Sequence, residues 1–240
     1  MDHKKYFVFI GTASLLHFRG VEHWLIEVAT RLRGSVILTF STGLKSIDKV
    51  KARVALAKSR LGNVEWHEIR AISHEHAGKG VPSFITRFMK HSGIVIPINL
   101  KMIKLLRGKF TYLVIGDAYQ AMLLTAIAAI SGARKVILGL HSRPNYKRFI
   151  LIKPLLALMN RTGLVKGIHA VNIVDALMLR RILSNIPVWW IPNGVDCRRF
   201  KPGAKRGDVF QALFVGALSD DKGLIRSQRR HESLRGITVT

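Results

Sequence analysis

The sequence predicts an α/β fold with a doubly wound, mostly parallel sheet, followed by the fragmentary start of a second domain. Short apolar runs of strand length alternate along the chain with longer segments whose apolar residues recur at helical spacing. This alternation is typical of βαβ units, in which helices cover both faces of a parallel sheet. The composition agrees, because 48% hydrophobic and 22% charged residues over 240 positions are typical of a globular protein.

The N-terminal third of the chain shows this pattern clearly. Residues 6–14 form a short apolar run ending at small residues, which predicts a buried parallel strand. Residues 20–32 place Trp24, Leu25 and Val28 on one apolar helical face. By the same criteria we expect strands at 35–40 and 64–69 and a basic helix at 45–61.

The middle of the chain continues the alternation after a less regular stretch. Gly78, Gly80 and Pro82 indicate a loop, and residues 84–89 and 98–106 have helical spacing. The expected strands that follow are 110–115, 135–140, 167–171 and 188–191, and the expected helices are 118–130, 146–159 with an interruption at Pro154, and 174–183.

The last 50 residues differ in character from the rest. A turn at residues 192–194 leads into a basic linker, after which residues 211–215 predict one more strand. The tail at 225–240 is polar and has no apolar period, so we expect it to be poorly ordered. We therefore expect an N-terminal domain over 1–192, a hinge over 193–207 and the start of a second domain over 208–240.

The charge distribution is strongly asymmetric. The net charge is +25, and between His76 and Val174 the one acidic residue is Asp117, against fifteen Lys and Arg. Such a surface attracts anionic lipid headgroups, phosphate-bearing substrates or nucleic acid, and charge alone does not choose among these partners. The chain lacks recognisable nucleic-acid-binding motifs, so a basic nucleic-acid-binding protein is supported by charge only.

Other features narrow the class of protein. Cys197 is the single cysteine, so no internal disulfide forms, and no Cys and His cluster has zinc-like spacing. No window offers about 18 uninterrupted apolar residues, and the N-terminus lacks a signal-peptide pattern. We therefore expect a cytoplasmic protein without a metal or other cofactor, and the basic surface suggests a peripheral position on the inner face of the membrane.

The segment after residue 189 carries the most specific motif. WIPNGVDCRRFKP, residues 190–202, is followed by ALFVGALSDDKGL, residues 212–224. These two linked motifs resemble the hinge and the next strand of retaining GT-B glycosyltransferases of the group-1 or family-4 type. The resemblance implies two Rossmann-like domains, with the acceptor bound by the N-terminal half and the donor by the C-terminal half. It implies transfer of a sugar from a nucleotide-sugar donor to a lipid or glycan acceptor with retention.

The resemblance also assigns candidate site residues. Arg19 and Gly20 stand where the family has a Gly-Gly-Val-Glu loop, whose backbone approaches a phosphate or sugar. His141 ends a strand where the family often has a Thr-x-His-Gly turn, and it can hydrogen-bond a sugar hydroxyl. Asp117 ends the preceding strand and either orients an acceptor hydroxyl or caps the helix after it.

Four further positions come from the same alignment with the family pattern. Asn172 lies where the family often has a serine near the crevice, and Asn193 and Gly194 belong to the hinge. Lys222 corresponds to a lysine that binds the donor diphosphate. We expect Gly20, His141 and Asn193 to converge on one crevice at the carboxyl ends of the strands.

Two departures from the family pattern bear on activity. Ala217 replaces the arginine that pairs with the lysine at the diphosphate, and a second domain with paired glutamates is missing after Leu224. We therefore expect a truncated product, a frameshifted gene or one part of a split enzyme whose C-terminal domain is separately encoded. We expect this chain alone not to turn over a nucleotide sugar at a normal rate. A non-catalytic acceptor-binding domain is the alternative.

Overall fold

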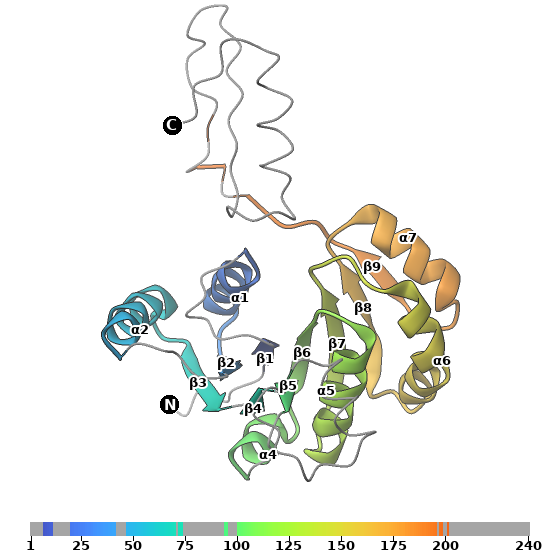
Figure 1. Cartoon of the computed structure of the whole chain (residues 1–240), viewed down its shortest axis with the longest axis horizontal. Coiled ribbons are helices and arrows are strands. Elements are labelled where there is room, and N and C mark those ends of the chain that lie inside the picture. Colours follow the sequence, from blue (N-terminus) through green and yellow to red (C-terminus); the bar gives the residue numbers. More distant parts are fainter. Residues whose placement is uncertain are drawn as a thin grey trace, which may run out of the picture. The chain divides into compact units, whose positions relative to one another are not determined.

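The computed structural model describes residues 7–11, 20–41, 47–70, 72–73, 94–95, 100–195, 197–198 and 201. The chain divides into two compact units, residues 1–194 and residues 195–240, and nearly all described residues belong to the first unit. The first unit is built around a seven-stranded parallel sheet with helices on both faces (Figure 1). The predicted α/β fold with a doubly wound parallel sheet is confirmed.

The strands of this sheet follow the order of a doubly wound fold. From edge to edge they are β3 (Glu65–Arg70), β2 (Ser35–Ser41), β1 (Phe7–Gly11), β6 (Phe110–Ile115), β7 (Lys135–Leu140), β8 (Val165–Ala170) and β9 (Val188–Trp190). Every neighbouring pair is parallel. The chain builds outward from β1 in one direction and from β6 in the other, so the topological switch point lies between these two strands. Ligands of doubly wound folds bind at the carboxyl edge of such a switch point.

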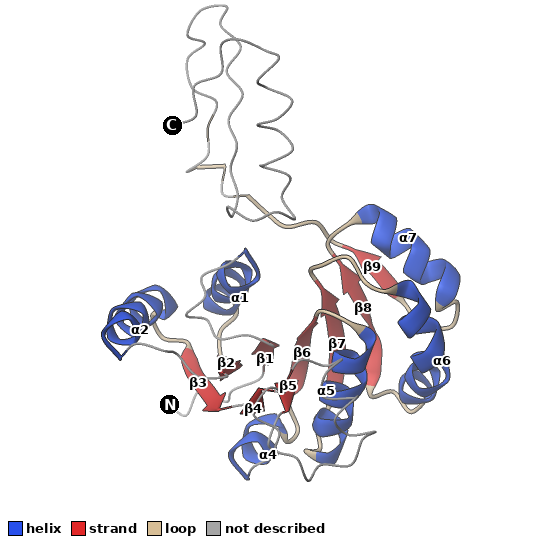
Figure 2. Ribbon diagram, viewed as in Figure 1, coloured by secondary structure: helices blue, strands red, loops and turns tan. Residues whose placement is uncertain are grey.

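Helices cover the sheet in two groups (Figure 2). On one face, α1 (Gly20–Arg31) and the end of α2 (Ile47–Leu61) share a core with Phe9, Ile37 and Val114. The opposite face packs against α4 (Leu100–Leu106), α5 (Ala118–Ile130), α6 (Tyr146–Arg161) and α7 (Ile173–Ile182). Because side chains alternate along each strand, Tyr112 and Val114 point to the α1 face and Leu113 and Ile115 to the other.

The predicted elements within the described residues are confirmed to within a few residues at their ends. One detail of the prediction is wrong, because α6 runs without a break through Pro154. Proline removes the hydrogen bond to the carbonyl of Ile150, and both residues lie on the exposed side of α6, where water is available to that carbonyl. The sequence also did not predict a small antiparallel pair, β4 (Ile72–Ser73) with β5 (Ile94–Val95).

Three predicted segments lie outside the described residues, namely the helix at 84–89, the strand at 211–215 and the tail at 225–240.

Candidate functional site

The carboxyl edge of the sheet brings together residues that lie far apart in the sequence. Asp117 follows β6, His141 follows β7, Asn172 follows β8, and Asn193 follows β9. Because these four neighbouring strands are parallel, their carboxyl ends meet at one edge. The described part of the chain shows no hydrogen bond between any two of these four residues, so each must be considered with its own partners.

Asp117 is the N-cap of α5. One carboxylate oxygen accepts the backbone N–H of Gln120 at 2.9 Å, and the other accepts the guanidinium of Arg148 at 3.3 Å. The guanidinium of Arg148 also lies over the ring of Tyr119, 5.2 Å from its centroid. The capping interpretation is confirmed, and the orientation of an acceptor hydroxyl by Asp117 stays a prediction.

Asn172 has a similar structural role at the next helix. Its side-chain oxygen accepts the backbone N–H of Val174 at 2.8 Å and so caps α7. Asn193 and Gly194 lie exposed after β9. Gly20 is the first residue of α1, and a Cβ atom built there would meet no atom within 4 Å. Arg19 and Lys222 lie outside the described residues, as does Ala217.

His141 is surrounded by three aromatic side chains from other elements. Its Nε2 lies 3.1 Å from the hydroxyl of Tyr112, a residue on β6. The same hydroxyl lies 2.5 Å from Nδ1 of His169, on β8. Trp24 of α1 packs against all three rings, with its centroid 4.4 Å from that of His141 and 5.1 Å from that of Tyr112. We call these four residues the Tyr–His cluster.

A glycine allows Tyr112 to reach across the sheet. In the register of the strands, Val114 is paired with Gly139 on β7, and Gly139 with His169 on β8. A Cβ atom at Gly139 would lie 1.9 Å from the Tyr112 hydroxyl oxygen. The ring of Tyr112 therefore lies over Gly139 and carries its hydroxyl from β6 towards the histidine of β8.

In the Tyr–His cluster, His169 is buried and Tyr112 and His141 are half-buried, and this burial shifts their pKa values. Burial, with a smaller contribution from the charge of His169, lowers the pKa of His141 to about 4. Burial also lowers the pKa of His169, although its hydrogen bond to the Ile191 carbonyl opposes this shift. Burial raises the pKa of the Tyr112 hydroxyl. At neutral pH all three side chains are uncharged.

The cluster is joined to the segment that carries the hinge motif. Nε2 of His169 lies 2.7 Å from the carbonyl oxygen of Ile191, and Ile191 stands two residues before Asn193. On the other side, Trp24 lies one helical turn after Gly20 in α1. His141 is thus linked through its neighbours to the elements that carry Gly20 and Asn193. The convergence of Gly20, His141 and Asn193 on one crevice stays a prediction.

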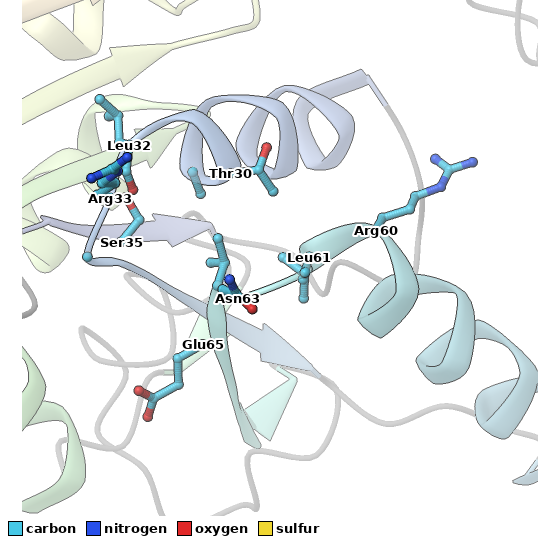
Figure 3. A pocket seen from close by; sticks show the side chains of 12 residues that line it. Thr30, Leu32, Arg33, Ser35, Arg60, Leu61, Asn63 and Glu65 are labelled. Atoms are coloured by element: carbon cyan, nitrogen blue, oxygen red, sulfur yellow. Dashed lines mark hydrogen bonds between the residues drawn. The ribbon is translucent and has the colours of Figure 1, made fainter. Parts of the chain in front are cut away.

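The hollows of the described surface include one along a face of the sheet and one at its amino edge. A hollow of about 450 Å³ extends along the α1 face of the sheet and is lined by Tyr112, His169, Trp24 and Trp189, with Lys135 and Lys166 near the start of their strands. A hollow of about 700 Å³ lies where α1 and α2 end and β2 and β3 begin, between Arg33, Arg60 and Glu65 (Figure 3). The second hollow is at the amino edge of the sheet, away from the predicted site residues that the structure describes.

Sequence reasoning did not predict the roles of Tyr112, His169 and Trp24. His169 offered a signal, because it stands in the otherwise apolar run 167–171 and a buried polar side chain needs a hydrogen-bond partner. Tyr112 and Trp24 gave no such signal, because each fits the apolar pattern of its predicted strand or helix. Within the described ranges, no group of three His, Cys, Asp or Glu is arranged to hold a metal ion.

Comparison with known proteins finds similarity to solved structures only. No protein-family model matches the chain, and no curated protein matches its sequence. Three chains of solved structures match this chain, and one of them is that of Phytolacca americana UGT2, complexed with UDP-2fluoro-glucose and pterostilbene. The two share 14% sequence identity with a TM-score of 0.45, and the match covers 83% of this chain and 57% of the UGT2 chain. The chain therefore spans little more than half of that protein.

A pair of variants tests the interpretation of Asp117 as the N-cap of α5. Asp117→Ala removes the cap and the partner of Arg148, so we expect the free energy of unfolding to fall by about 1–2 kcal/mol. Asp117→Asn keeps an oxygen that accepts the Gln120 N–H, so most of this loss should be recovered. Urea unfolding followed by circular dichroism measures both. Equal stability of Asp117→Ala and the unaltered chain would contradict the capping role.

Proposed function

We propose that this chain forms the acceptor-side part of a glycosyltransferase that transfers a sugar from a nucleotide-sugar donor to a lipid or glycan acceptor with retention. The supporting observation is the link between the hinge motif and the Tyr–His cluster. Ile191, in WIPNGVD, accepts a hydrogen bond from His169, and His169 shares the Tyr112 hydroxyl with His141. The hinge motif, which suggests the function, is thus connected through His169 and Tyr112 to His141, the residue that would bind a sugar hydroxyl.

The proposed chemistry needs little from this part of the chain beyond binding and orientation. His141 would hydrogen-bond a sugar hydroxyl, and Arg19 and Gly20 would approach a phosphate or sugar before α1. Asn172, Asn193 and Gly194 would line the acceptor side, and Lys222 would bind the donor diphosphate as a point charge. Positioning of two reactants face to face supplies about 7–11 kcal/mol of barrier lowering in favourable cases.

We propose the same division of the chain as the sequence predicts, with residues 1–192 as the acceptor-side domain, 193–207 as the hinge and 208–240 as the start of a donor-side domain. The boundary between the two compact units falls after Gly194 in the sequence, within the proposed hinge. The proposal requires a complete donor-side domain as the partner of the acceptor-side domain. A non-catalytic acceptor-binding domain is the second candidate function, and Ala217 favours it because a bidentate diphosphate ligand is lost there.

The proposal is tested by binding and turnover together. The purified chain is titrated with a panel of nucleotide sugars and of lipid and glycan acceptors, and nucleoside diphosphate release is measured with and without a donor-side domain of the same family. We expect acceptor binding by the chain and acceptor-dependent release once the second domain is added. His141→Gln should weaken acceptor binding about tenfold, which corresponds to one hydrogen bond of about 1.4 kcal/mol.

Ser142→Ala is the matched control, because Ser142 is the exposed neighbour of His141. This variant should bind like the unaltered chain. Binding without release under any condition would support the non-catalytic alternative. Failure of every sugar and acceptor to bind would contradict both candidate functions.

We also propose that an anionic membrane surface is a partner of α6 and α7. Large apolar side chains are exposed along both helices, with Leu151 72% and Val174 58% accessible. The set comprises Ile150, Leu151 and Leu158 on α6 and Ile173, Val174, Leu177 and Met178 on α7. We call it the α6–α7 apolar surface. Exposed apolar side chains that gather on neighbouring elements indicate an interaction surface.

The charges around the α6–α7 apolar surface favour a lipid partner. Lys147, Lys153, Arg161, Arg180 and Arg181 lie on the same two helices. The one acidic residue of α6 and α7 is Asp175, which is buried and accepts a hydrogen bond from Tyr146 at 2.5 Å. Apolar side chains with a basic rim suit anionic headgroups over an acyl interior. No helix in the described part of the chain is long and apolar enough to cross a bilayer.

A further inference from the structure

The direction of each hydrogen bond in the Tyr–His cluster follows from one fixed point. The Ile191 carbonyl oxygen only accepts, so Nε2 of His169 carries a proton and donates it there. His169 is uncharged at neutral pH, because burial lowers its pKa, so its Nδ1 has a lone pair and accepts. The Tyr112 hydroxyl is then the donor to Nδ1 of His169. These proton positions are assigned from the network.

The same reasoning carries through to His141. The Tyr112 hydroxyl has one proton, which is used towards His169, so towards His141 its oxygen accepts. Nε2 of His141 is therefore the donor and carries the proton of the neutral ring. Nδ1 of His141 is left with a lone pair, for which the described residues provide no hydrogen-bond partner. A chain of donors thus runs from His141 to Tyr112, to His169 and to the Ile191 backbone.

We propose that Tyr112 and His169 are positioning residues, which hold His141 as its Nε2-protonated tautomer and so present Nδ1 as an acceptor for a substrate hydroxyl. The proposal deepens the proposed function and rests on it for the identity of the hydroxyl as that of a sugar. The substrate class it implies is a hydroxyl that donates to His141, and not an anionic oxygen that would require a proton from it.

The packing around His141 favours this role over a merely structural one. Trp24 lies against the ring at 4.4 Å between centroids, and the ring of His169 stands edge-on to it at 5.6 Å. These contacts fix the ring plane, while the hydrogen bond to Tyr112 fixes which nitrogen faces the protein. A neutral ring with one engaged and one unengaged nitrogen is a pre-organised acceptor. The lowered pKa of about 4 keeps this ring uncharged at neutral pH.

The test uses nitrogen-15 NMR of the full chain labelled at histidine, since ring nitrogens with and without a proton have distinct shifts. The His141 signals are assigned by their loss in His141→Gln. In the unaltered chain we expect a protonated Nε2 and an unprotonated Nδ1. In Tyr112→Phe the constraint is gone, so we expect a mixture of tautomers. In His169→Leu the Tyr112 proton turns towards His141, so we expect the opposite tautomer.

Two variants serve as controls. Thr111→Val removes a buried hydroxyl on the opposite face of the same strand, which has no hydrogen-bond partner among the described residues, so it should leave the His141 signals unchanged. His169→Asn provides a side-chain oxygen that accepts from Tyr112 in place of Nδ1, so it should restore the original tautomer that His169→Leu loses. If Tyr112→Phe does not fold, the two His169 variants carry the same comparison. An unchanged tautomer in both Tyr112→Phe and His169→Leu would overturn the proposal.

A second readout separates this proposal from the proposed function. Affinity for whichever acceptor binds the unaltered chain should fall about fivefold to tenfold in Tyr112→Phe and stay unchanged in Thr111→Val. A changed tautomer in Tyr112→Phe, together with unchanged affinity in both Tyr112→Phe and His141→Gln, would overturn the substrate role of His141 and leave acceptor binding elsewhere intact. Altered affinity with an unchanged tautomer would overturn the positioning role and leave the proposed function standing.

Discussion

Replacing Gly139 by alanine is expected to lower the free energy of unfolding by about 3 kcal/mol, a large effect for one methyl group. The added Cβ would stand 1.9–2.3 Å from the hydroxyl oxygen and two ring carbons of Tyr112. The ring of Tyr112 must move, so its hydrogen bonds to His141 and His169 and its packing against Trp24 are lost. Guanidinium unfolding followed by tryptophan fluorescence measures the change.

A double-mutant cycle identifies the cause of this loss. In a Tyr112→Ala background the ring is absent, so adding Gly139→Ala should cost less than about 0.5 kcal/mol, and the two substitutions should be strongly non-additive. Gly20→Ala is the control for a glycine in open space, and it should be neutral or slightly stabilising at the start of α1. Additive losses from Gly139→Ala and Tyr112→Ala would contradict the proposed contact.

The double variant Leu151→Glu with Leu177→Glu is expected to weaken binding to anionic vesicles about 100-fold. Each exposed leucine contributes about 1–2 kcal/mol when it enters the acyl boundary, and each glutamate adds repulsion from the headgroups. Binding by the unaltered chain should require acidic lipid and should fall as salt is raised, since surface charges are screened. Co-sedimentation with phosphatidylserine-containing vesicles and with pure phosphatidylcholine vesicles measures both dependences.

Ile130→Glu provides the matched control, because Ile130 is 68% exposed at the end of α5 but lies outside the α6–α7 apolar surface. This variant should bind vesicles like the unaltered chain. Equal binding to neutral and anionic vesicles would contradict the role of the basic rim. Concentration-dependent dimerisation that Leu151→Glu abolishes, without vesicle binding, would instead identify a second copy of the chain as the occupant of this surface.

The order of strands and helices was predictable because each element carries its own local signal. Buried parallel strands appear as short apolar runs, as in residues 110–115, and amphipathic helices repeat every three to four residues, as in 20–32. The position of Asp117 and His141 at one edge was also predictable, since parallel strands bring their carboxyl ends together. The predicted interruption at Pro154 was wrong, because the effect of a proline depends on whether the carbonyl that loses its hydrogen bond is exposed to water.

The sequence by itself thus determined the α/β class, the doubly wound parallel sheet and the edge at which Asp117, His141, Asn172 and Asn193 lie. Only the tertiary structure decided which side chains surround His141. Tyr112 reaches His169 across Gly139, a diagonal contact over three strands that depends on the register between them. No local pattern encodes that register, because a strand's apolar period specifies the face of each residue and not its neighbour on the next strand. The proton positions in the Tyr–His cluster follow from this arrangement alone.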